Sequence, residues 1–77
     1  MSDKTYYEEA HAEVSEEIER RILMSKIEMQ GSRRAIKYKE PQPIYPIAGR
    51  VTWERHLQVE KLKKQMWERA LNAIDEE

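Results

Sequence analysis

Glu8 and His11 are the one pair of side chains spaced as metal chemistry requires. They form Glu-x-x-His, which places both groups on one helix face, as in di-iron carboxylate bundles. Such a centre needs a second copy of the motif and two further glutamates, and the chain contains one motif. A dimer would duplicate it, but Glu/His pairs arise readily by chance in a charge-rich helix. We therefore expect no metal site.

The chain shows no residue spacing typical of acid–base or nucleophilic catalysis. His11 and His56 are the only histidines, and neither has a serine or acid at a spacing typical of a catalytic triad. No glycine-rich phosphate loop is present, and the absence of cysteine excludes thiol chemistry and disulfides. We expect a protein that is not an enzyme, with no catalytic residues and no cofactor.

The length and composition indicate a small domain that needs additional stabilisation. The chain has 77 residues, of which 38% are charged and 39% hydrophobic. A domain of this size buries only about 60% of the surface that its unfolded chain exposes. Without disulfides, tight helix packing, a partner or oligomerisation must stabilise it. No apolar run approaches the roughly 20 residues of a membrane span. The charged amino terminus resembles no signal peptide, so we expect no membrane partner and a cytoplasmic location.

The charges are segregated along the chain although the net charge is only -1. Residues 1–19 carry seven acids and one base, whereas residues 20–39 carry seven bases and one acid. Blocks of this kind favour head-to-tail pairing or separate acidic and basic binding surfaces.

Two long helices are predicted, over residues of about 6–30 and 53–75. Gly31 is expected to end the first helix as its C′ residue, and Thr52 to cap the start of the second. Apolar residues spaced by three and four predict the packed faces. In the first helix they are Tyr7, Ala10, His11, Val14, Ile18, Ile22, Ser25 and Met29, and in the second Val59, Leu62, Met66, Trp67, Ala70, Ala73 and Ile74.

The segment between the predicted helices, residues 31–50, begins with bases and continues with prolines. Pro41, Pro43 and Pro46 exclude an α-helix and favour an extended strap, and Ala48-Gly49 is expected to turn the chain. The predicted fold is therefore all-α: a single small domain in which a proline-rich strap connects two helices. We expect a helical hairpin or open bundle that oligomerisation or a partner completes.

Several apolar residues lie where a two-helix fold would not cover them, because Leu23 and Ile27 are opposite the main apolar stripe of the first helix. Aromatic, Met and Arg side chains are enriched at protein interfaces. The residues expected to bind a partner are Leu23, Ile27, Tyr38, Ile44, Tyr45 and Trp53. We expect a non-catalytic interaction module, such as a small inhibitor, adaptor or assembly factor, that also forms a homodimer.

A nucleic-acid-binding regulator is the alternative function. Arg33, Arg34, Lys37 and Lys39 cluster around Tyr38, and such bases could contact phosphates while the ring stacks on a base. In the preferred interpretation, the same four bases steer the chain towards an acidic protein face.

Overall fold

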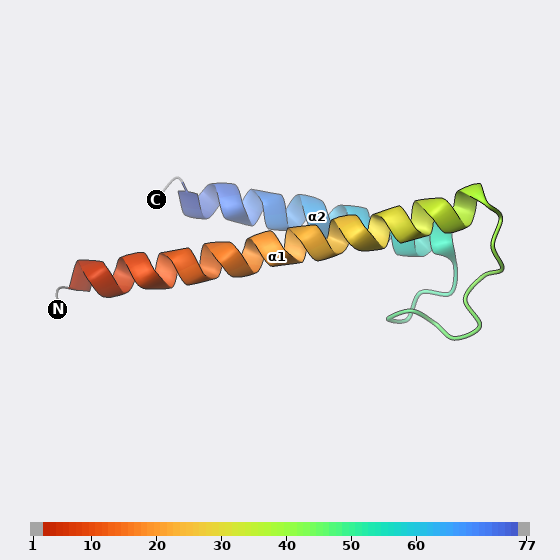
Figure 1. The fold of residues 1–77 in the computed structure, drawn as a ribbon, viewed down its shortest axis with the longest axis horizontal. Helices are drawn as coiled ribbons and strands as arrows, with labels where there is room; N and C mark the ends of the chain where they lie inside the picture. The colour runs from red at the N-terminus through yellow and green to blue at the C-terminus, as the bar shows by residue number, and fades with distance from the viewer. Residues whose placement is uncertain (1–2, 76–77) are drawn as a thin grey trace.

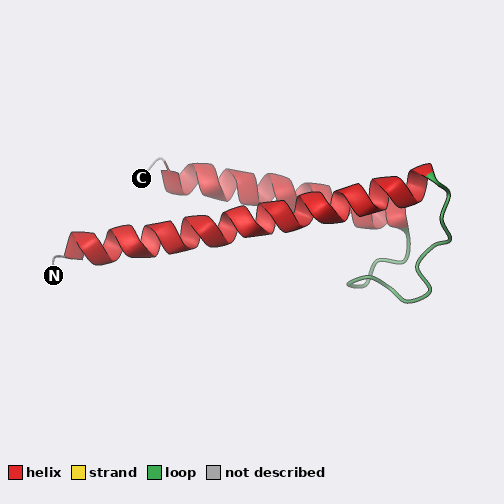
Figure 2. Cartoon of the chain, viewed as in Figure 1, coloured by secondary structure: helices red, strands yellow, loops and turns green. Residues whose placement is uncertain are grey.

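The computed structural model describes residues 3–75 as an antiparallel hairpin of two helices (Figure 1). Helix α1 spans Asp3–Lys37 and helix α2 spans Trp53–Asp75. Residues 38–52, called the connector below, join the helices as loop and turn (Figure 2). The molecule is long and narrow, with extents of 56 × 21 × 17 Å. The predicted all-α hairpin is confirmed.

Helix α1 packs through one stripe of residues spaced alternately by three and four, the spacing of a coiled-coil seam. The seam residues, all buried or half-buried, are His11, Ser15, Ile18, Ile22, Ser25, Met29, Ser32 and Ile36. The predicted stripe is right at His11, Ile18, Ile22, Ser25 and Met29. It is wrong at Tyr7, Ala10 and Val14, which are exposed. Tyr7 lies one turn before His11, which already contacts the Ile74 carbonyl near the end of α2, and Val14 falls between the seam positions His11 and Ser15.

The apolar core of the hairpin is thin. Ile18, Met29 and Ala35 are the buried apolar side chains in the described part of the chain, and Ser25 and Ser32 are buried on the same seam. Small side chains at a helix contact allow the two axes to approach closely. The hairpin therefore depends on close packing of α1 against α2 rather than on a large apolar interior.

Gly31 does not end α1, contrary to the prediction. The helix continues through Gly31 to Lys37, and Gly31 is not among the residues with a positive φ. Two residues just beyond it, Ser32 and Ala35, are buried, so packing keeps this part of the chain helical. This tertiary contact outweighs the roughly 1 kcal/mol by which glycine disfavours a helix interior. Arg33, Arg34 and Lys37 are therefore helical rather than part of an extended arm.

Helix α1 ends in a Schellman motif built on a lysine. Lys39 has a φ of 53°. Its amide donates to the carbonyl of Ile36 at 3.2 Å, and the Glu40 amide donates to the carbonyl of Ala35 at 2.9 Å. These are the two hydrogen bonds of the motif, with Lys39 at the C′ position that glycine usually occupies. Pro41 follows and prevents the helix from resuming.

Helix α2 begins where the sequence predicts, but its packed face is only partly the predicted one: Val59, Trp67, Ala70 and Ile74 are half-buried, whereas Ala73 is exposed. The Thr52 hydroxyl accepts a hydrogen bond from the Arg55 amide at 3.1 Å, which confirms the N-cap. The predicted apolar face is wrong at Leu62 and Met66, since both are exposed. His56 and Glu60 are buried instead. This face can be buried because charged partners satisfy both polar groups, as described below.

Candidate functional site

The first part of the connector is fixed to the start of α2. The indole Nε1 of Trp53 donates to the Pro41 carbonyl at 2.9 Å, and the Trp53 amide donates to Oε1 of Gln42 at 2.9 Å. The side-chain amide of Gln42 also donates to Glu54 at 3.4 Å. Trp53, which the sequence assigns to partner binding, therefore holds the connector in place and is only half-exposed.

The last part of the connector folds into a tight turn. Ile47 and Arg50 exchange two backbone hydrogen bonds of 3.0 Å each. Ala48 and Gly49 between them have φ angles of 50° and 82°, the pattern of a type I′ turn. The predicted turn at Ala48-Gly49 is confirmed. The extended strap is not confirmed, because the chain bends at residues 44–45 before it enters this turn.

Between these two fixed points the connector exposes its largest apolar side chains. Ile44 is 89% exposed and Tyr45 is 82% exposed, whereas Pro43 and Ile47 on either side are half-buried. Neither exposed side chain contributes to the core. The connector therefore presents two adjacent apolar groups to solvent from a segment with anchored ends.

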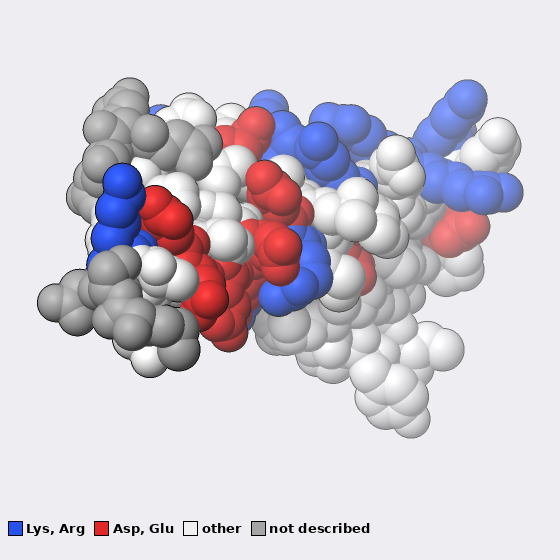
Figure 3. Space-filling view, turned by 60° about the vertical axis from the view of Figure 1, so that its left-hand side comes forward, with Lys and Arg blue, Asp and Glu red and all other residues white. Residues whose placement is uncertain are grey.

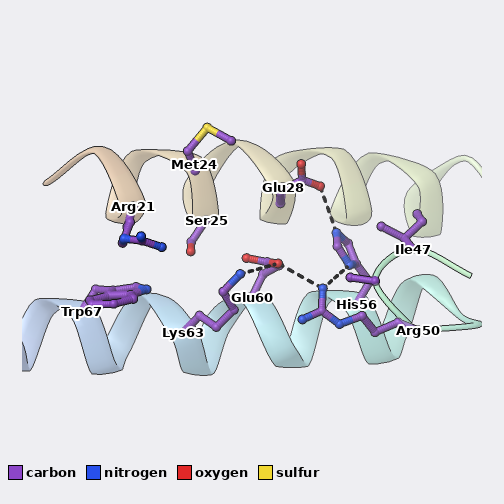
Figure 4. A pocket seen from close by; sticks show the side chains of 11 residues that line it. Arg21, Met24, Ser25, Glu28, Ile47, Arg50, His56, Glu60, Lys63 and Trp67 are labelled. Atoms are coloured by element: carbon purple, nitrogen blue, oxygen red, sulfur yellow. Dashed lines mark hydrogen bonds and ion pairs between the residues drawn. The ribbon is translucent and has the colours of Figure 1, made fainter. Parts of the chain in front are cut away.

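A buried polar cluster joins the turn to both helices (Figure 4). His56 and Glu60 of α2 are only 2% and 3% exposed. Nη1 of Arg50 lies 3.3 Å from Oε1 of Glu60, and the Lys63 Nζ lies 3.3 Å from the same oxygen. Nε2 of His56 lies 3.0 Å from Oε2 of Glu28 on α1. The buried Glu60 carboxylate is thus paired with two cations, as a buried charge requires, whereas the Glu28 side chain is 47% exposed.

The contacts of His56 define its tautomer. Nη1 of Arg50 approaches Nδ1 at 3.5 Å, and a guanidinium has only donors, so Nδ1 must accept. Nε2 then carries the proton and donates it to Glu28. Both ring nitrogens and one Glu60 oxygen are therefore engaged within the protein. This cluster of Glu28, Arg50, His56 and Glu60 connects α1, α2 and the connector, and is called the latch below.

A hollow of about 350 Å³ lies beside this cluster. Its other walls include Met24 of α1, Ile47 of the connector and Trp67 of α2. The guanidinium of Arg21 lies over the Trp67 ring at 5.1 Å from its centroid, a cation–π contact that occupies one end (Figure 4). The hollow thus adjoins charged groups that already have partners.

Leu23 and Ile27, predicted to bind a partner, are exposed on α1 as expected. Leu23 contributes to a second hollow of about 380 Å³ with Leu71 and Asn72 of α2. Met24, the next residue, contributes to the connector-side hollow. Successive helix residues point about 100° apart, so the Leu23 surface and the connector lie on different sides of the hairpin. The structure does not combine the predicted partner-binding residues into one patch.

The predicted basic group is split between a helix and its cap. Arg33, Arg34 and Lys37 lie on the last turns of α1, and Lys39 occupies the C′ position. The exposed Tyr38 ring lies 6.0 Å from the Arg34 guanidinium and 5.5 Å from the Lys37 ammonium. These bases therefore surround the aromatic ring as the sequence suggests, but they are held on helical geometry.

His11 has a structural contact at the open end of the hairpin. Its Nε2 lies 3.1 Å from the carbonyl of Ile74 near the end of α2. Because a carbonyl only accepts, this nitrogen must donate and has no lone pair for a metal. Among the side chains that the structure describes, residues 4–74, no three His, Asp or Glu groups lie together as a metal ion would require.

The latch was not predicted from the sequence. Its residues, Glu28, Arg50, His56 and Glu60, lie on three segments that only the fold brings together. A signal was available in α2, because Trp53, His56, Glu60 and Trp67 recur at seam spacing. Because Leu62 and Met66 are apolar and His56 and Glu60 are polar, hydrophobic periodicity alone predicts that Leu62 and Met66 lie on the packed face.

Comparison of the chain with known protein families, characterised proteins and solved structures finds no match. No helix within residues 3–75 has the length and apolar character to cross a membrane.

Proposed function

We propose that this chain is a non-catalytic protein-binding module that engages a larger protein through Ile44 and Tyr45. The observation that carries the proposal is the exposure of these two side chains, 89% and 82%, on a connector anchored at both ends. A backbone segment anchored on both sides loses less conformational entropy on binding than a free loop, which favours affinity. An adaptor, inhibitor or assembly factor fits this arrangement.

The flanking prolines support the same interpretation. Pro43 and Pro46 restrict the backbone on both sides of the exposed pair, and restriction in the free state lowers the ordering cost on binding. Tyrosine is also enriched among residues that dominate binding energy. The arginine and histidine of the latch act at a distance, by keeping the connector in its presented position.

The test is to capture a partner from the source cell, identify it, and titrate the purified partner. Replacement of both residues, Ile44→Ser with Tyr45→Ser, should weaken the dissociation constant by about tenfold or more, the scale of a lost hot spot. Gln58→Ser, an exposed change on α2, is the matched control and should leave affinity unchanged. Equal binding by the double variant and the wild type would refute the proposal.

Nucleic-acid binding is the second candidate, and one feature favours it. Lys26, Arg33 and Lys64 line a single hollow of about 200 Å³, and no carboxylate contributes to its lining. A phosphate group would be attracted there, and binding would weaken steeply with log salt. Titration with duplex DNA and single-stranded RNA at about 0.15 M salt provides the test. Dissociation constants well below the nonspecific range of about 10⁻⁴–10⁻⁶ M would favour this candidate.

A further inference from the structure

Helix α1 carries a second stripe at seam spacing, here called the outer stripe, on a solvent-exposed flank beside the seam that packs on α2. Its residues, all exposed, are Glu9, Ala12, Glu16, Glu19, Leu23, Lys26, Gln30, Arg33 and Lys37. The steps alternate between three and four, as they do in the seam that packs on α2. The outer stripe therefore has the spacing of a helix-packing seam and borders α2 at shallow hollows, but its residues stay exposed because no helix covers them in the hairpin.

The charges of the outer stripe reverse sign at Leu23. The charged residues before Leu23 are acids, and those after it are bases. The fold enhances this polarity, because residues 24–66 hold ten bases and four acids, whereas 3–23 and 67–75 hold four bases and nine acids. Figure 3 shows acidic side chains mainly towards the chain termini and basic ones mainly towards the opposite end.

The charges of the stripe have no ion-pair partners within the described chain. Elsewhere on α1, Glu17 pairs with Arg21 at 3.1 Å, so the helix does form such pairs. In the stripe, by contrast, Glu16 and Glu19 lie three apart, and Arg33 and Lys37 lie four apart. Like charges at these spacings destabilise a helix slightly. Repulsion between these like charges destabilises the isolated hairpin slightly. The same charges become stabilising when a second helix places opposite charges beside them.

We infer that α1 pairs with α1 of a second copy in antiparallel orientation, with Leu23 on the two-fold axis. Glu9 and Lys37 both lie fourteen residues from Leu23, about 21 Å at 1.5 Å per residue, so each meets the other across the axis. Glu19 and Lys26 meet within one residue of register by the same rule. A two-fold contact must be self-complementary, and the stripe meets that condition at Glu9 with Lys37 and at Glu19 with Lys26.

The surface around Leu23 suits such a contact. Leu23 is 57% exposed and lies between two shallow hollows of about 380 and 300 Å³. Across a two-fold axis, Leu23 of each copy can insert into the hollow beside Leu23 of the other copy. Ile27 adds apolar area to the contact. Leu23 and Ile27 would supply affinity, and the charges would select the antiparallel orientation, because parallel pairing aligns like charges.

This pairing surface is independent of the connector surface proposed for the protein partner, since Leu23 and the connector lie on different sides. Variants in Ile44 and Tyr45 should therefore dimerise normally. Failure of one proposal leaves the other standing.

Cysteine cross-linking tests the inference sharply, because the chain contains no cysteine. Under mild oxidation, Leu23→Cys should form a covalent dimer about tenfold faster than Met66→Cys, an exposed position on α2 that serves as control. Glu9→Cys mixed with Lys37→Cys should cross-link to each other faster than either variant does alone. Preferential disulfide formation between two copies of Glu9→Cys, and between two copies of Lys37→Cys, would indicate parallel pairing and would overturn the inference.

Charge reversal supplies an independent readout. Glu16→Lys with Glu19→Lys should weaken dimerisation about tenfold or more, and so should Lys26→Glu with Arg33→Glu. A mixture of the two double variants should form a heterodimer, because one stripe is then basic and the other acidic. Sedimentation measures all three samples, and circular dichroism checks that helix content is unchanged. A wild-type monomer at about 100 µM, or a mixture that fails to associate, would refute the inference. So would charge-reversed variants that lose DNA binding but dimerise as the wild type does.

Discussion

Nη1 of Arg50 lies 3.3 Å from Oε1 of Glu60, so the turn that closes the connector is tied to the buried face of α2. Their side chains are 15% and 4% exposed, which makes this a largely desolvated ion pair. Breaking a buried pair leaves an uncompensated charge, whereas replacing both partners costs much less. The Glu60 carboxylate is therefore a main anchor of the turn at residues 47–50, whereas Trp53 and Gln42 fix the first part of the connector.

Glu60→Ala is expected to destabilise the hairpin by about 2–4 kcal/mol, because Arg50 would remain without its buried partner. Urea unfolding measures the change. Arg50→Ala with Glu60→Ala together should cost less than the sum of the single changes, as expected for interacting groups. Glu17→Ala, which removes the exposed partner of Arg21, is the control and should change stability by less than about 0.5 kcal/mol. Additive effects at Arg50 and Glu60 would contradict the described latch.

The two glycines should respond to alanine in opposite directions. A Cβ at Gly31 meets no atom within 4 Å, and Gly31 lies inside α1, so Gly31→Ala should stabilise by about 0.5–1 kcal/mol. Gly49 also has open space, but its φ is 82°, so Gly49→Ala should destabilise by roughly 1 kcal/mol. Thermal unfolding of the two variants provides the comparison. Destabilisation by Gly31→Ala would mean that the helix does end at this residue.

Ser32→Ala should leave stability unchanged or raise it by about 1 kcal/mol. Ser32 is 1% exposed, and its hydroxyl oxygen has no hydrogen-bond partner in the described structure. Removing an unsatisfied buried hydroxyl relieves its desolvation cost, and alanine is the better helix former. Chemical denaturation gives the sign. A loss above about 1 kcal/mol would show that the hydroxyl has a partner after all.

The comparison of sequence and structure separates local signals from tertiary ones. Thr52 as a cap, Ala48-Gly49 as a turn and Leu23 facing outwards follow from local chemistry or helix periodicity, and all three are confirmed. Gly31 was misread because glycine is locally a stop signal, and the burial of Ser32 just after it is a long-range effect.

The buried face of α2 was misread for a related reason. His56 and Glu60 look solvent-facing until Arg50 and Glu28, from distant segments, are placed beside them. Hydrophobic periodicity scores a residue type alone, whereas the cost of burying a polar group depends on its partners. The candidate functional site combines both kinds of information, because Ile44 and Tyr45 are recognisable as apolar but their presentation depends on the latch.

The connector side chains should be dispensable for folding, unlike the seam of α1. Ile44→Ser with Tyr45→Ser should change the free energy of unfolding by less than about 0.5 kcal/mol, since exposed positions outside the core contribute little. Ile18→Ala should cost about 2–3 kcal/mol, because Ile18 is 6% exposed on the packed seam. Denaturant titration at one fixed protein concentration compares them and keeps any self-association constant. A large loss from the connector pair would show that Ile44 and Tyr45 pack internally, and would remove the physical basis for assigning them to a partner.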